Sequence, residues 1–123
     1  MDRTGIEQLR VHVLHLHKLL VDAEREVLER LEGRLTGHQF LERLLHDEAY
    51  AWLKLMSAVI IGFDEWLDDA EAAPAAADAY VDELRRILNP DPAGDHFQRR
   101  YADLLQQRPE VVMAHARVAA ALR

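Results

Sequence analysis

Apolar residues recur at helical spacing along almost the whole chain, and this periodicity is the feature that most restricts its fold. Over residues 5–32 the apolar positions alternate steps of three and four, as in a helix that packs one side into a bundle. Those positions are Ile6, Leu9, Val13, Leu16, Leu20, Ala23, Val27 and Leu31. No segment shows the strict alternation of a half-buried strand. The chain is therefore predicted to be all-α.

Capping signals divide the first half of the chain. Gly33 stands where a left-handed residue ends a helix, and Thr36 with Gln39 has the form of a capping box that starts the next one. Asp47 is itself a competent N-cap. Residues 38–69 can therefore form either one bent helix or two.

Prolines divide the second half. Pro74, in an alanine-rich connection, and Pro109 are suited to the first turn of a helix, while residues 89–94 contain two prolines and form a turn. Together these boundaries predict an antiparallel helical bundle with four main helices plus one or two short ones. A chain of 123 residues has the usual size of one domain, so we expect residues 1–123 to form a single domain.

Composition narrows the classes of function. The formal net charge is -7 and only two lysines occur, so nucleic-acid binding is not expected. No apolar window is long enough to span a bilayer, and no signal-peptide pattern opens the sequence. Cysteine is absent, so the chain has no disulfides and is compatible with a reducing compartment. We expect a cytoplasmic protein without a membrane partner.

Four residues able to bind metal or exchange protons fall inside the apolar stripes: His17, Glu24, Glu48 and His115. Inward-facing histidine and glutamate from facing helices are the ligands with which bundles hold metal ions. These four are therefore the candidate ligands of a divalent metal ion. The favoured interpretation is nonetheless that each is a buried polar residue with a local structural partner, and a His17–Glu24 pair is one such arrangement. Metal binding is the alternative.

Catalytic motifs are lacking. Ser57 is the only serine and has no glycine-rich turn around it, and the five glycines are isolated, so neither a hydrolase nucleophile nor a phosphate-binding loop is predicted. The Glu-x-x-His motif of di-iron bundles is also missing. We expect no catalytic residues and no cofactor other than the alternative metal ion.

Several apolar residues lie off the main stripes, namely Leu19, Tyr50, Leu53 and Ile61. Such residues either cover a second helix of the same chain or form a contact patch between molecules. For so small and apolar a bundle, a homodimer is the favoured interpretation.

Two segments resemble a family of small bacterial all-helical proteins of unknown function. They are Leu44-Leu45-His46-Asp47-Glu48-Ala49-Tyr50-Ala51-Trp52-Leu53 and Arg108-Pro109-Glu110-Val111-Val112-Met113-Ala114-His115. The resemblance implies an all-helical fold and no site residues. The leading hypothesis is thus a non-catalytic bundle acting through protein–protein contacts, and the alternative is a bundle that binds a metal ion or small ligand.

Overall fold

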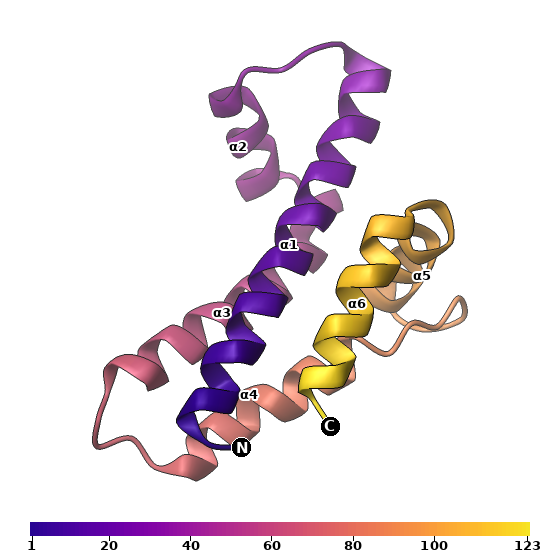
Figure 1. Ribbon diagram of the computed structural model, residues 1–123. Helices are drawn as coiled ribbons and strands as arrows, with labels where there is room; N and C mark the ends of the chain where they lie inside the picture. The colour runs from indigo at the N-terminus through magenta and orange to yellow at the C-terminus, as the bar shows by residue number, and fades with distance from the viewer.

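The computed structural model describes all residues 1–123, which form six α-helices, one short 3-10 helix and no strands (Figure 1). The all-α prediction is confirmed. In chain order the elements are α1 (Arg3–Glu32), α2 (Gly37–His46), the 3-10 helix η1 (Glu48–Tyr50), α3 (Ala51–Asp68), α4 (Pro74–Ile87), α5 (His96–Gln107) and α6 (Pro109–Ala121).

The longest helix, α1, packs against α3 on one side and against α6 on the other, while α4 packs on α3 (Figure 1). The predicted seam of α1 faces this core: Ile6, Leu9, Val13, Leu16 and Leu20 are all fully buried. Both chain ends lie near the N-terminal end of α1, because α6 runs back along it. The buried apolar residues form one connected core.

The chain breaks at Asp47, so residues 38–69 form two helices rather than one. The Asp47 carboxylate accepts a hydrogen bond from the Ala49 backbone N–H at 2.9 Å, and its backbone is extended there. Before the break, α2 lies beside the C-terminal half of α1 (Figure 1). Of its residues only Phe40 is buried, so much of the apolar side of α2 is left uncovered.

The predicted helix starts are confirmed. Thr36 and Gln39 form the full capping box, with hydrogen bonds of 3.1 and 2.9 Å, and Pro74 and Pro109 each occupy the first turn of a helix. Gly33 ends α1 with a φ of 84°, a conformation that favours glycine.

Burial differs from the sequence pattern at a few positions. Tyr50 and Leu53 are buried within the chain itself. Tyr50 is covered by α2, whose Phe40 ring packs edge-on against it with centroids 6.3 Å apart. Leu31, predicted in the seam, is 80% exposed because the last turn of α1 extends past its neighbours (Figure 1). Of the off-stripe residues, Ile61 alone is well exposed, at 56%.

Candidate functional site

Glu24 is the one buried charged residue, with 6% of its surface exposed. Its carboxylate accepts hydrogen bonds from the guanidinium of Arg100, on α5, including one of 3.0 Å from Nε. The pair therefore joins the C-terminal half of α1 to α5. Burying a carboxylate without such a partner would be costly, and the arginine meets that need.

His17 is half-buried where α1 meets α3. Its Nε2 lies 2.9 Å from the Ser57 hydroxyl, which is also 3.3 Å from the Leu53 carbonyl oxygen. Burial lowers the pKa of His17, so the ring is neutral near pH 7. His17 thus has a different partner from Glu24. The role of Ser57 was missed because it lies at the edge of the α3 stripe, where helical periodicity alone predicts a polar surface position.

His115 is half-buried on α6, and its Nδ1 lies 2.6 Å from the hydroxyl of Tyr101 on α5. Tyr101 is fully enclosed, and burial raises its pKa, so the hydroxyl keeps its proton. Burial also lowers the pKa of His115. Because Nδ1 is the only partner of the Tyr101 hydroxyl, the hydroxyl donates to it, and the neutral ring holds its proton on Nε2.

Glu48 does not face the core. It is exposed in η1. The inward direction was predicted for an unbroken helix, and the extended backbone at Asp47 changes the direction of the chain just before Glu48. Glu48 borders a surface pocket of about 400 Å³ together with Trp52, Asp95 and His96. The expectation that Glu48 lies inward is wrong.

The four candidate ligands therefore lie at separate places with separate surroundings. The structure contains no group of three or more histidine, aspartate or glutamate side chains able to hold a metal ion. Three of the four have a side-chain partner of their own, namely Arg100, Ser57 and Tyr101.

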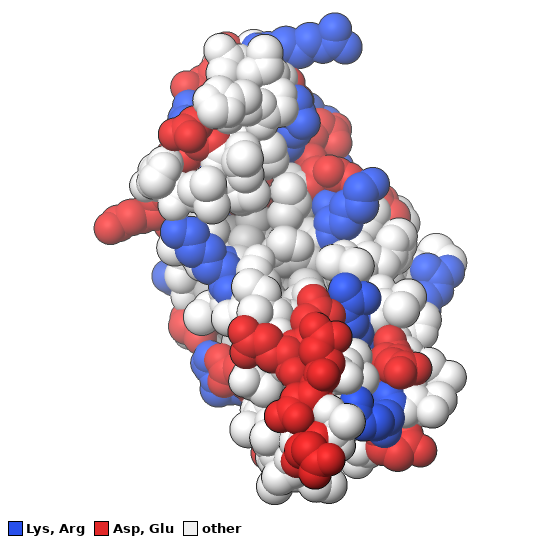
Figure 2. Space-filling model, turned by 90° about the vertical axis from the view of Figure 1, so that its left-hand side faces the viewer, with Lys and Arg blue, Asp and Glu red and all other residues white.

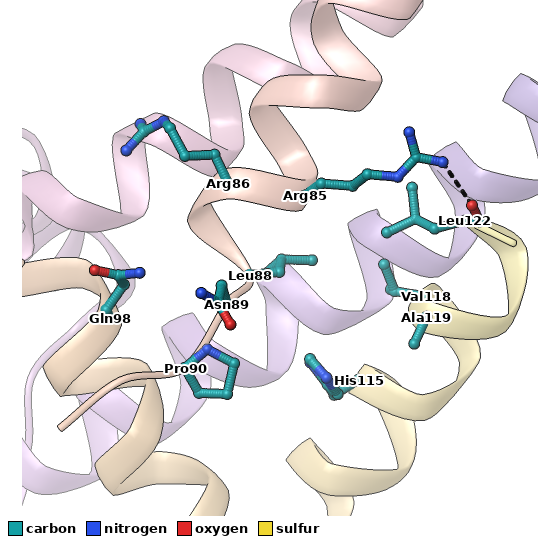
Figure 3. Close-up of a pocket in the computed structure, with 10 residues that line it drawn as sticks. All are labelled: Arg85, Arg86, Leu88, Asn89, Pro90, Gln98, His115, Val118, Ala119 and Leu122. Atoms are coloured by element: carbon teal, nitrogen blue, oxygen red, sulfur yellow. Dashed lines mark hydrogen bonds between the residues drawn. The ribbon is translucent and has the colours of Figure 1, made fainter. Parts of the chain in front are cut away.

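His115 borders a pocket of about 480 Å³ between the end of α4, the loop after it and α6 (Figure 3). Two arginines of α4 stand at its edge, and both have partners. Arg85 donates to the Leu122 carbonyl oxygen at 2.7 Å, and Arg86 pairs with Glu83 at 2.6 Å. Figure 3 shows the Arg86 side chain directed away from His115. Arg85 also lies 3.6 Å from Asp82, so each of the two arginines is paired with a carboxylate of α4.

A second hollow, of about 600 Å³, lies on α1 beside α2 and is mainly apolar. Val11, Leu14 and Val21 of α1 and Leu44 of α2 line it, with His17 and Lys18. Leu41 and Leu45, on the same helix as Leu44, and Ile61 of α3 are each about half exposed. Figure 2 shows this side of the molecule: a broad uncharged band runs from the upper end to the middle. Side chains of both signs border it, and the largest group of acidic side chains lies below.

The comparisons with known proteins identify no relative: no family model, curated protein or solved structure matches the chain. None of the helices is both long and apolar enough to cross a membrane. The surface of the molecule is therefore the source of functional information.

Proposed function

We propose that this chain is a non-catalytic helical protein that acts through protein–protein contact, and that the apolar side of α1, α2 and α3 is the contact surface. The observation that supports this proposal is the concentration of exposed apolar side chains there. Ten large apolar residues of the chain are exposed, and two of them, Val11 and Leu14, line this hollow. Seven of the ten lie on α1, α2 and α3, namely Val11, Leu14, Leu31, Leu41, Leu45, Leu55 and Ile61.

Scattered apolar residues on a surface are ordinary, whereas a contiguous group bordered by charge is typical of a docking site. α2 adds to this argument. It is strongly amphipathic, yet it buries only Phe40 against its own chain. A helix that short derives its stability from packing of its apolar side, so a partner covering Leu41 and Leu45 would also stabilise α2.

The partner that we propose is a second copy of the chain, and the compartment is the cytoplasm, which the lack of cysteine permits. Homodimers are the commonest oligomers, and their interfaces are more apolar than the remaining surface. The assembly would then be the functional unit.

Solution mass tests the proposal. Light scattering after size exclusion should give twice the 14.1 kDa chain mass at high concentration, and a single Leu14→Glu substitution should reduce it to that of the monomer. Met113→Glu is the matched control, since Met113 is 60% exposed on α6, on the other side of α1. A native chain that stays monomeric at millimolar concentration would exclude self-association.

A further inference from the structure

The charged residues at the border of this contact surface are arranged by sign along α1 and α3. This arrangement follows from the way in which the two helices pack against each other. Arg10 pairs with Asp64, and His17 is bonded to Ser57. Seven residues toward the C-terminus of α1, from Arg10 to His17, correspond to seven residues toward the N-terminus of α3, from Asp64 to Ser57. The two helices are therefore antiparallel. These two links set the register of α3 against α1.

On α1, one exposed row contains Glu7, Val11, Leu14 and Lys18, spaced four, three and four apart. On α3, a second exposed row contains Lys54, Ile61 and Asp68, each seven apart. The register places Lys54 near the level of Lys18, Ile61 beside Leu14, and Asp68 near Glu7.

Both rows therefore have a base toward α2, apolar residues in the middle and an acid at the far end. We call these seven residues the α1–α3 face. Figure 2 shows the largest group of acidic side chains below the uncharged band, and side chains of both signs beside the band higher up. Lys18 and Lys54 are the only two lysines of the chain.

We propose that a second copy docks on the α1–α3 face in an antiparallel arrangement. The two-fold axis lies in the contact plane, perpendicular to α1, at the level of Leu14 and Ile61. Lys18 of each copy then meets Glu7 of the other, and Lys54 meets Asp68, while the apolar residues meet at the centre. This arrangement rests on the proposed function and specifies its geometry.

The charges involved are free to make these contacts. Glu7 and Asp68 are exposed and take part in no ion pair. Lys18 makes one exposed ion pair with Asp22 of its own helix, at 3.8 Å, and such a solvent-exposed pair contributes little and can be exchanged for another. The Lys54 ammonium donates only to the Leu45 carbonyl oxygen, at 2.8 Å. A parallel arrangement would place lysines opposite lysines and acids opposite acids, so charge selects against it.

A charge-swap experiment tests the arrangement. One variant makes both ends acidic (Lys18→Glu with Lys54→Glu), and the other makes both ends basic (Glu7→Lys with Asp68→Lys). Each variant alone should self-associate at least ~tenfold more weakly than the native chain, since symmetry repeats every repulsive pair. An equimolar mixture should form a heterodimer with an affinity at least that of the native dimer, which native mass spectrometry would detect.

The control removes two exposed cations elsewhere, Arg99→Glu with Arg117→Glu, and should leave the dissociation constant unchanged. If both swap variants dimerise as strongly as the native chain, the antiparallel arrangement is wrong although self-association stands. A native chain that is monomeric throughout overturns both the arrangement and the proposed function. Variants that weaken alone but fail to combine in the mixture also overturn the arrangement.

Discussion

Glu24 and Arg100 make the most enclosed charge contact of the molecule, with side-chain exposures of 7% and 24%. Replacing such a pair by apolar residues can cost little, whereas removing one partner leaves an uncompensated charge inside the protein. The two residues are not equally enclosed, so the two single substitutions should differ. A lone Arg100 can still reach water, but a lone Glu24 carboxylate cannot.

We predict that Glu24→Gln lowers the free energy of unfolding by about 2 kcal/mol and that Arg100→Met lowers it by more, about 3–4 kcal/mol. The double variant should be more stable than Arg100→Met alone, because no unpaired charge remains. Urea denaturation measures all three. Glu71→Gln, at an exposed residue without an ion pair, is the control and should change stability by less than about 0.5 kcal/mol. Equal losses from both single variants would contradict this account.

Helical periodicity could identify Glu24, His17 and His115 as polar residues on apolar stripes, but it could not identify their partners. Arg100 is 76 residues from Glu24 and Ser57 is 40 from His17. Each partner is set by how two helices are rotated and shifted against each other, which a stripe does not specify. Glu48 was misplaced for a related reason: the prediction of its direction assumed an unbroken helix at Asp47.

Among the elements, α3 and α4 are in close contact at Gly62. A Cβ built on Gly62 would lie 2.3 Å from a ring carbon of Tyr80, well inside the contact distance of any two carbon atoms. The Tyr80 ring also packs edge-to-face against Phe63, with centroids 6.1 Å apart. Glycine is normally unfavourable within a helix, so its presence here follows from the close contact between the two helices.

Gly62→Ala is therefore expected to destabilise the protein by about 1–3 kcal/mol, despite the higher helix propensity of alanine. In a Tyr80→Ala background the same substitution should be neutral or stabilising, because the ring that obstructs the Cβ is gone. Thermal or urea unfolding of the four proteins gives this double-mutant cycle. A stabilising Gly62→Ala in the native background would show that Tyr80 moves aside freely.

Helix boundaries were largely predictable because they depend on local chemistry. The capping box at Thr36, the prolines at 74 and 109 and the N-cap at Asp47 each act within one turn of the residue concerned. The uncovered side of α2 was not predictable in the same way. Its leucines form a regular apolar face in the sequence, and only the placement of α2 beside α1 leaves Leu41 and Leu45 exposed.

For the whole molecule, the two half-buried histidines link folding to pH. Burial lowers the pKa of both His17 and His115 below the ordinary value of 6.5. Below that pH the unfolded chain takes up protons at these two positions before the folded chain does, so the unfolded state gains stability. The stabilisation is fully present above about pH 6.5 and is lost as the pH falls toward the lowered values. Arg108 and Arg86 lower the pKa values of Glu26 and Glu83, so these two carboxylates change the free energy of unfolding only below about pH 4.5.

The free energy of unfolding should therefore decrease between pH 7 and pH 5, and a His17→Gln with His115→Gln variant should lose most of this dependence. Urea titrations at several pH values measure it, at a protein concentration low enough to keep the chain monomeric. The matched control is His38→Gln with His96→Gln, at two exposed histidines, and it should keep the native slope. The interpretation would be refuted by a double core variant with an unchanged slope, since some other group would then be binding the protons.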